Sequence, residues 1–116
     1  MLMIFVSDLQ KAKHFYRDVL GFPLKSENDS RLIFISGTQD FIAFRCLENS
    51  PIENYSQKAR SVFVFEVSSI EKEFSKFKTR GVNFLHNKPK ENEFCFYAAF
   101  QDPFGNVHEI AELKNV

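Results

Sequence analysis

Apolar and polar residues follow one another along the chain in an order that predicts strands and helices in turn. The apolar run over residues 2–6 is short, as in a strand, and Ser7 and Asp8 after it can cap a helix. Apolar residues then recur at helical spacing as far as Gly21, a residue type that commonly ends helices. This helical stripe consists of Leu9, Ala12, Phe15, Tyr16, Val19 and Leu20. Three further extended segments are predicted at residues 24–26, 31–36 and 40–46.

The same order of elements returns after a polar stretch. Residues 48–60 are mostly polar and are predicted to form a linker. A strand over residues 61–67 precedes a second helix, whose apolar stripe consists of Ile70, Phe74 and Phe77. The last three strands are predicted at residues 82–85, 94–100 and 107–113.

The two halves also resemble each other in amino-acid sequence. Residues 6–11 match residues 67–72, residues 20–22 match residues 80–82, and residues 39–40 match residues 101–102. A single βαβββ module leaves one face of its sheet uncovered, so two modules have to combine to close a core. The sequence therefore predicts an α+β fold of two tandem βαβββ modules, with module 1 at about 1–47, the linker at about 48–60 and module 2 at about 61–116.

Length and composition narrow the class of protein. The chain has 116 residues and a mass of 13.6 kDa, which fits one domain over residues 1–116. Fifteen basic and fifteen acidic residues give a net charge of +0, so no nucleic-acid partner is expected. No apolar run is long enough for a signal peptide or a membrane span, which favours a cytoplasmic protein with no membrane partner. Cys46 and Cys95 are too few for a thiolate metal site and are expected to be core residues.

Three motifs resemble those of one superfamily. They are Val6-x-Asp8-Leu9, residues 15–22 (Phe-Tyr-Arg-Asp-Val-Leu-Gly-Phe) and residues 102–110 (Asp-Pro-Phe-Gly-Asn-Val-His-Glu-Ile). Together with the duplicated module, they are similar to the vicinal oxygen chelate superfamily of glyoxalases, bleomycin-resistance proteins and extradiol dioxygenases. The resemblance implies a cupped, mixed eight-stranded sheet with helices on its convex face, and a homodimer with ligand cavities at or near the interface. The superfamily carries out many chemistries, so the resemblance does not specify a reaction.

Catalytic members of this superfamily hold a divalent metal through side chains from four strands. Aligning the motifs puts Met1, Ala43, Val62 and Glu109 at those four positions. Only Glu109 offers a suitable donor, and a catalytic divalent ion needs at least three protein ligands. A shift by one residue would bring in Leu2, Ile42, Phe44 or Phe63, which are no better donors. The sequence therefore predicts no metal and no other cofactor, and it disfavours metal-dependent catalysis.

The three histidines do not replace the missing ligands. His14 is expected on the solvated side or at the boundary of the first helix, and His86 at the end of a strand, near the rim of the cup. His108 alternates with Glu109, so the two side chains point to opposite faces of their strand and cannot share one ion.

Alternation along the strands predicts which side chains line the cup. The predicted lining is Met1, Met3, Phe5, Phe41, Ala43, Arg45, Val62, Val64, Glu66, Val107, Glu109 and Ala111. The predicted ligand-binding residues among them are Met3, Phe5, Phe41, Arg45, Glu66 and Glu109. Alternatively, the aromatic and methionine side chains simply fill the cup, with Arg45 paired to Glu66 or Glu109. In either case Glu109 needs a partner, such as Arg45 or the hydroxyl of Tyr97.

Three functions of different classes follow from this lining. A mostly apolar surface with a few charges suits a metal-free protein that binds a small organic molecule. Glu66 and Glu109 favour a cationic ligand and Arg45 an anionic one, so the charge of the ligand stays open. The alternatives are a metal-dependent glyoxalase-type lyase or dioxygenase, and an interaction module without a small-molecule site. No nucleophile with an adjacent base is apparent, so catalytic residues stay unassigned.

Overall fold

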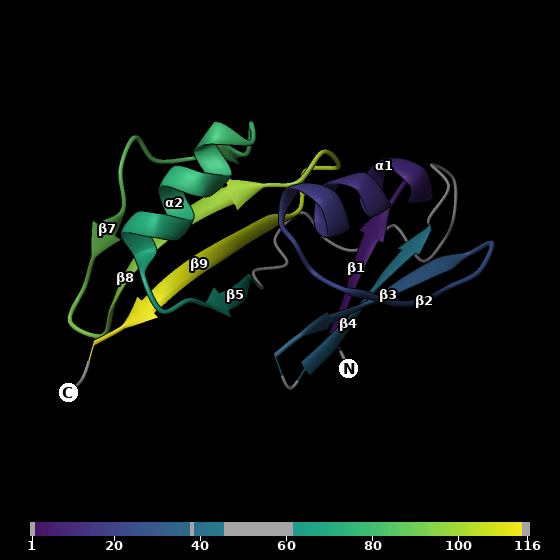
Figure 1. Cartoon of the computed structure of the whole chain (residues 1–116), viewed down its shortest axis with the longest axis horizontal. Coiled ribbons are helices and arrows are strands. Elements are labelled where there is room, and N and C mark those ends of the chain that lie inside the picture. The colour runs from purple at the N-terminus through teal and green to yellow at the C-terminus, as the bar shows by residue number, and fades with distance from the viewer. Residues whose placement is uncertain (1, 38, 46–61, 115–116) are drawn as a thin grey trace. The chain divides into compact units, whose positions relative to one another are not determined.

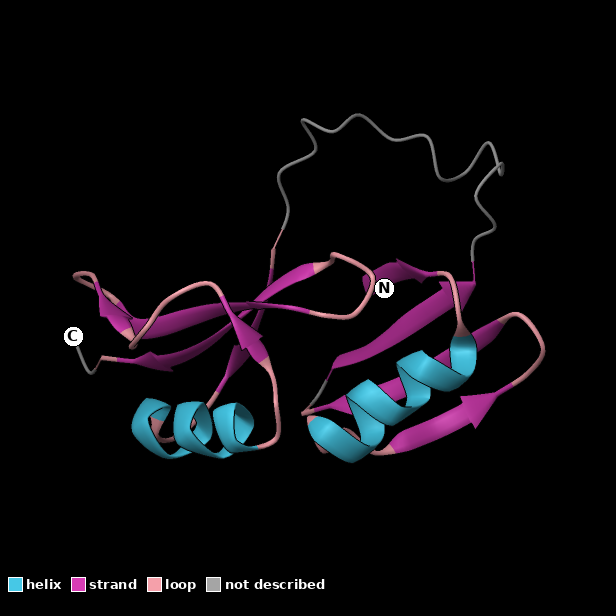
Figure 2. Cartoon of the chain, turned by 90° about the horizontal axis from the view of Figure 1, so that it is seen from above, coloured by secondary structure: helices cyan, strands magenta, loops and turns pink. Residues whose placement is uncertain are grey.

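The computed structural model describes residues 2–37, 39–45 and 62–114 and divides the chain into two compact units (Figure 1). Unit 1 is Met1–Arg60 and unit 2 is Ser61–Val116. Each unit contains one mixed sheet with helix packed against one of its faces (Figure 2). The predicted linker at residues 48–60 lies outside the described residues.

Unit 1 has a four-stranded sheet in the order β1-β4-β3-β2. The strands are β1 (Leu2–Val6), β2 (Leu24–Glu27), β3 (Arg31–Ser36) and β4 (Gln39–Arg45). Strand β1 runs parallel to β4, whereas β4, β3 and β2 pair antiparallel. Between β1 and β2 the chain forms helix α1 (Leu9–Lys13), which continues as a π-helix, η1 (His14–Val19).

The first helix begins and ends as its sequence predicts, but its second half is wound more widely. Asp8 caps the helix by accepting a hydrogen bond from the backbone N–H of Lys11 at 3.1 Å. At the other end, the N–H of Leu20 donates to the carbonyl of Phe15 at 2.9 Å, five residues back rather than four. The predicted single α-helix is therefore α-helical over its first five residues only. Gly21 follows with φ of 89°, the left-handed conformation that glycine adopts without strain.

Unit 2 repeats this arrangement with a five-stranded sheet in the order β5-β9-β8-β6, in which β7 also pairs with β8. The strands are β5 (Phe63–Glu66), β6 (Asn83–Phe84), β7 (Lys90–Glu91), β8 (Cys95–Gln101) and β9 (Val107–Leu113), and the helix is α2 (Ile70–Thr79). Strand β5 runs parallel to β9, and the other pairs are antiparallel. Three apolar residues of α2, Ile70, Phe74 and Phe77, are buried as the spacing predicts.

Residues 102–106 form the tight turn before the last strand. The Asp102 carboxylate accepts hydrogen bonds from the backbone N–H groups of Phe104 (2.9 Å) and Asn106 (2.8 Å) and from the side-chain amide of Asn106 (2.7 Å). Gly105 has φ of 89°. The Asp-Pro-Phe-Gly-Asn motif therefore has a local structural role, which is to hold this turn.

The α+β class and the duplicated βαβββ order are confirmed, with three corrections. Instead of one cupped sheet of eight strands, the described residues form a four-stranded and a five-stranded sheet, nine strands in all. The strand predicted at 82–85 is reduced to Asn83–Phe84, and the short β7 was not predicted. Strands over Arg31–Ser36 and Val107–Leu113 have the predicted bounds.

Candidate functional site

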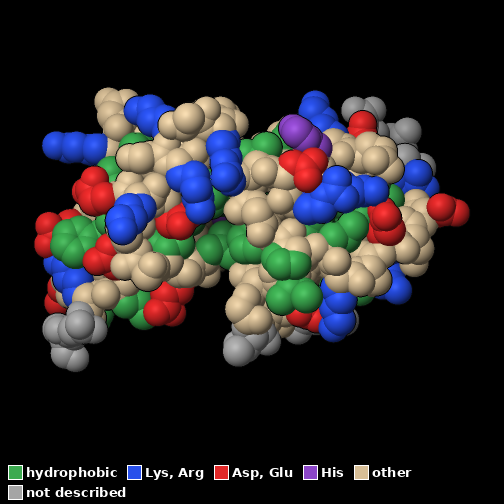
Figure 3. Space-filling view, in the orientation of Figure 1, with side chains coloured by type: hydrophobic (Ala, Val, Ile, Leu, Met, Phe, Trp, Pro, Cys, Tyr) green, Lys and Arg blue, Asp and Glu red, His purple; other side chains and the backbone are tan. Residues whose placement is uncertain are grey.

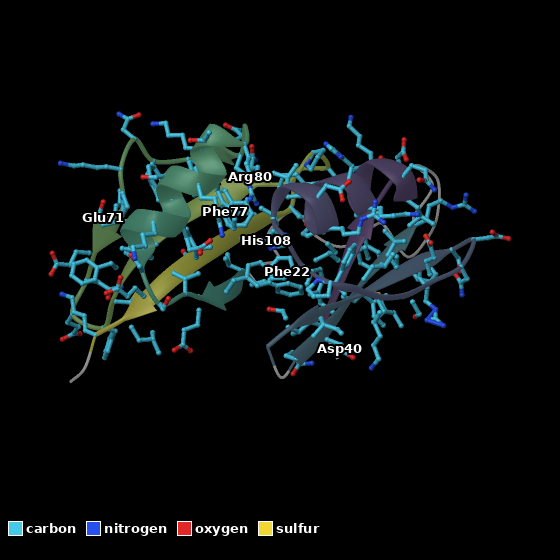
Figure 4. All side chains as sticks on the ribbon, viewed as in Figure 1. Phe22, Asp40, Glu71, Phe77, Arg80 and His108 are labelled. Atoms are coloured by element: carbon cyan, nitrogen blue, oxygen red, sulfur yellow. The ribbon has the colours of Figure 1, made fainter. Side chains whose placement is uncertain are left out.

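In each unit one face of the sheet is covered by helix, and we call the opposite face the open face of that unit. On the open face of unit 1, Met3 pairs with Ile42 and Phe5 with Phe44 across β1 and β4. Met3 is 43% exposed and Phe5 is half-buried. Asp40, two residues before Ile42, lies on the side of the sheet away from α1 (Figure 4). Met3 and Phe5 therefore lie on the open face, where the sequence placed them.

Phe41, Ala43 and Arg45 do not share that face, which corrects the predicted lining. The register pairs Ile4 with Ala43 and Val6 with Arg45, on the side of the sheet that the helix covers. Phe41 is 1% exposed, and its ring lies 5.5 Å from that of Tyr16 in the helix. Alternation shows which residues of one strand share a face. Which faces of two neighbouring strands lie on the same side of the sheet depends on their pairing register, and the prediction assumed the wrong register for β1 and β4. Ile42 and Phe44 stand on the open face instead, and neither offers a donor.

Arg45 lines a separate pocket of about 380 Å³ in unit 1. The other lining residues are Ser7, Asp8, Leu9, Gln10, Asn28 and Asp29, from the start of the helix and the β2–β3 turn. Arg45 is exposed at the end of β4 and forms no side-chain ion pair within the described part of the chain. The residue expected to place a positive charge on the open face is therefore on the other side of its sheet.

Glu66 and Glu109 do share one face, the open face of unit 2. Val64 pairs with Glu109 and Glu66 with Ala111 across β5 and β9. On the other side of β9, Ala99 pairs with Glu109 and Tyr97 with Ala111. Val64 is 54% exposed and Glu109 is half-buried, whereas Ala99 and Ala111 are buried. The open face of unit 2 thus carries carboxylates, apolar residues, one tyrosine and, paired with that tyrosine, Lys90 of β7.

The sequence did not identify Tyr97 and His86 as a pair. Their ring centroids lie 6.1 Å apart with planes at 87°, an edge-to-face arrangement. Tyr97 faces the same side as Ala111 because the two residues pair across β8 and β9. Alternation within β8 could have grouped Tyr97 with Ala99, but only the register assigns that group to the open face. His86 follows the short strand β6, near the expected rim position.

Glu109 is not joined to Tyr97, one of its two predicted partners. Among the described residues, no hydrogen bond or ion pair links its side chain to Tyr97. Arg45, the other predicted partner, belongs to unit 1 and lies on the helix-covered side of that sheet, and its pairing with Glu109 stays a prediction. Because Glu109 is half-buried, its carboxylate has partial access to water, which lowers the cost of leaving it without a protein partner.

His108 lies on the face opposite Glu109, as alternation predicted. The side chain is 1% exposed and is surrounded by the rings of Phe63, Phe65 and Phe100, at 5.6, 5.5 and 5.5 Å between centroids. It belongs to the layer between α2 and β9, near Phe77 (Figure 4). Burial lowers the pKa of His108 to about 4, and the nearby Asp102 carboxylate opposes part of this shift. His108 is thus a neutral core residue at physiological pH.

The donors do not fit the superfamily's divalent metal. In residues 2–37, 39–45 and 62–114, no three His, Cys, Asp or Glu side chains come together in a way that could hold a metal ion. Of the four aligned positions, Ala43 and Val62 are apolar and only Glu109 offers a donor. Met1 lies outside the described residues. In the part of the chain that the structure covers, no helix is long and apolar enough to span a membrane.

Comparisons with known proteins agree with the architecture. The model of the Glyoxalase/Bleomycin resistance protein/Dioxygenase superfamily matches residues 1–110. YetH of Bacillus subtilis (strain 168) is 28% identical over 115 residues, which cover 94% of this chain and 92% of YetH. The crystal structure of lactoylglutathione lyase from Agrobacterium tumefaciens has a TM-score of 0.74 at 22% identity, covering 97% of this chain and 92% of that one. TnmS3, an antibiotic binding protein from Streptomyces sp. CB03234, has a TM-score of 0.76 at 20% identity, covering 98% and 95%.

Proposed function

The chain belongs to the glyoxalase/bleomycin resistance protein/dioxygenase superfamily, and on that premise we propose that it binds a small organic molecule on the open face of unit 2. The observation that carries this proposal is the composition of that face. Val64 and Leu113 provide exposed apolar surface, and Glu66 and Glu109 provide charged groups on the same face. Mostly apolar sites with a few polar groups are typical of small-molecule binding.

Binding without a metal is the second part of the proposal. The superfamily's catalytic members need several donors around one ion, and this chain offers Glu109 alone at the aligned positions. The proposed function therefore includes no metal-dependent step. TnmS3 is described as an antibiotic binding protein, and its similar fold is compatible with a binding role for this chain.

A homodimer is the third part of the proposal. The open faces of both units expose large apolar side chains, among them Met3 and Ile35 in unit 1 and Val64 and Leu113 in unit 2. A second copy of the chain would remove such surface from water, which is favourable by about 25 cal/mol per Å². Molar mass from light scattering at micromolar concentration should give twice 13.6 kDa. A cytoplasmic location and the absence of nucleic-acid and membrane partners stay predictions from the sequence.

Metal analysis tests the metal-free part of the proposal. Protein purified without chelators should contain far less than one Zn, Ni, Mn or Fe ion per chain. A near-stoichiometric ion would contradict the proposal and favour the lyase or dioxygenase alternative.

A thermal-shift screen of small organic molecules tests binding itself. A ligand at 100 times its Kd stabilises the folded state by about 2.7 kcal/mol. Val64→Arg, which puts a long charged side chain on the open face, should remove the shift. Ser75→Arg adds the same side chain to the exposed surface of α2 and should preserve the shift. If no compound in a broad library shifts the melting temperature, the interaction-module alternative is favoured.

A further inference from the structure

We infer that the pocket beside Arg45 in unit 1 binds a small zwitterion, a molecule that carries both a carboxylate and an ammonium group, as an amino acid does. The pocket belongs to the side of unit 1 on which the helix lies. The inference is therefore independent of the function proposed for the open face of unit 2. It follows from a comparison of the two units, which repeat the same order of elements.

Arg45 occupies the position in unit 1 that Glu112 occupies in unit 2. Val6, the last residue of β1, pairs with Arg45 of β4. The counterpart of Val6 in the repeated sequence is Val67, which follows β5 and donates its N–H to the carbonyl of Ala111 at 2.8 Å. The parallel register of β5 and β9 therefore places Glu112 beside Val67. The two units thus have opposite charges at the same point of the fold.

Glu112 has a definite role at this point, which Arg45 cannot fill. Its carboxylate accepts a hydrogen bond at 2.8 Å from the N–H of Ile70, the first residue of α2. The counterpart of Ile70 is Leu9, the first residue of α1, whose N–H likewise has no partner within its helix. A guanidinium has donors only and accepts no hydrogen bond. In unit 1 the place of the Glu112 carboxylate is therefore open to a carboxylate from a ligand.

The capping residue Asp8 does not take this place. It accepts a hydrogen bond from the N–H of Lys11 at 3.1 Å, two residues further into the helix than Leu9. In unit 2, Ser69 makes the equivalent contact with the N–H of Lys72 at 3.3 Å, and the Glu112 carboxylate is present in addition. The helical turns of unit 1 also continue past α1, because its five residues are followed directly by the six of η1.

A cavity of about 380 Å³ lies at this position, and both Leu9 and Arg45 line it. The backbone N–H of Arg45 donates to the carbonyl of Ser30 at 2.8 Å, which holds the β2–β3 turn beside the end of β4. Arginine binds carboxylates through two parallel hydrogen bonds, and cavities of this volume accommodate small organic molecules. The guanidinium and the start of the helix are thus placed to bind one carboxylate between them.

Two carboxylates in the same lining decide the second charge of the ligand. Asp8 and Asp29 line the cavity together with Arg45. A ligand with negative charge alone would be attracted by Arg45 and repelled by both aspartates. A ligand that has an ammonium group close to its carboxylate can place each charge beside its opposite.

The charges of the pocket are not already paired with each other. Among the described residues, Asp8, Asp29 and Arg45 take part in no ion pair. The outer surface of the same helix differs, because Arg17 contacts Asp18 there at 2.8 Å, and side chains of both signs lie next to one another over the helix of unit 1 in Figure 3. The pocket therefore offers charges of both signs to a ligand.

Three forms of one amino acid test both halves of the inference. L-alanine is a zwitterion, N-acetyl-L-alanine keeps only the carboxylate charge, and L-alaninamide at mildly acidic pH keeps only the ammonium charge. NMR titration of the full-length protein with L-alanine should give saturable shifts at the amides of Leu9 and Asp29, and both derivatives should bind about tenfold or more weakly. Equally tight binding of either derivative, or no saturable shift with L-alanine at about 100 mM, would overturn the inference. Neither result bears on the open face of unit 2.

Variants assign the binding to the two ends of the pocket. Arg45→Gln should weaken L-alanine by about tenfold, and Asp29→Asn by about threefold or more. Arg45→Lys keeps the charge without the two parallel donors, so its loss should be smaller than that of Arg45→Gln. Arg17→Gln, on the exposed surface of the helix, is the matched control and should change the affinity by less than about twofold. If Arg45→Gln is folded by circular dichroism and binds L-alanine as the unmodified protein does, the inference is wrong.

Discussion

The backbone N–H of Ile70, the first residue of α2, donates to the Glu112 carboxylate of β9 at 2.8 Å. This contact joins residues 42 positions apart and is partly buried. The N–H groups in the first turn of a helix have no partner within the helix, and the helix dipole favours a negative charge there. Glu112 therefore fixes the start of α2 over the sheet that carries the open face.

Replacing Glu112 should loosen this attachment. Glu112→Ala is expected to lower the free energy of unfolding by about 1–2 kcal/mol, because it removes a hydrogen bond to a charged group. Glu112→Gln keeps a hydrogen-bond acceptor but not the charge, so it should lower the free energy of unfolding by less than Glu112→Ala does. Urea denaturation measures both changes. Glu93→Ala, at an exposed position, serves as the control, and equal effects of Glu112→Ala and Glu93→Ala would contradict the role of the contact.

The buried position of Phe41 gives a direct test of the β1–β4 register. Phe41→Ala should cost about 3–5 kcal/mol, the usual loss for a fully buried phenylalanine, because its ring packs with Tyr16, Phe22 and Phe34. Met3→Ala, on the open face, should lower the free energy of unfolding by less than about 1 kcal/mol. The sequence-based lining, with Phe41 facing a cavity beside Met3, predicts similar small losses for both. Chemical denaturation of the two variants distinguishes the two arrangements.

Phe41 also shows what the sequence could and could not predict. The repeated motifs and helix caps gave the βαβββ order and the bounds of β3 and β9, because these signals are local. The face of a strand relative to its neighbour depends on a register set by long-range pairing, and a shift of one residue exchanges the faces. For unit 2 the assumed register was right, and Glu66 and Glu109 share a face. For unit 1 it was not, and Arg45 was placed on the wrong side.

His108 should make the protein sensitive to acid. Its pKa of about 4 in the folded state lies below the ordinary value of 6.5, so the unfolded chain takes up a proton first as the pH falls. The contribution of His108 to stability is complete above about pH 6.5 and is lost as the pH falls toward 4, by about 3 kcal/mol in total. Urea midpoints measured between these limits test this. His108→Phe should flatten the profile, whereas Ser75→Ala, at an exposed position with no titratable group, should leave the profile unchanged.

Asp102 should matter for the turn and not for binding. Asp102→Ala removes the acceptor of three hydrogen bonds and is expected to cost about 2–3 kcal/mol. Asp29→Ala, at an exposed turn position in unit 1, should cost less than about 0.5 kcal/mol. At a temperature where the Asp102→Ala variant stays folded, its affinity for a compound found in the thermal-shift screen should match that of the unmodified protein. A loss of affinity without a loss of stability would assign Asp102 to the site.

The measurement that tests the binding site most directly is NMR mapping of the amide signals during titration with a compound found in the thermal-shift screen. Saturable shifts should concentrate at Glu66, Tyr97, Glu109 and Ala111, the neighbours on the open face of unit 2. Val64→Arg should abolish these shifts, and Ser75→Arg should not. Shifts confined to the exposed side of α2, or to the pocket beside Arg45, would contradict the assignment of ligand binding to the open face of unit 2.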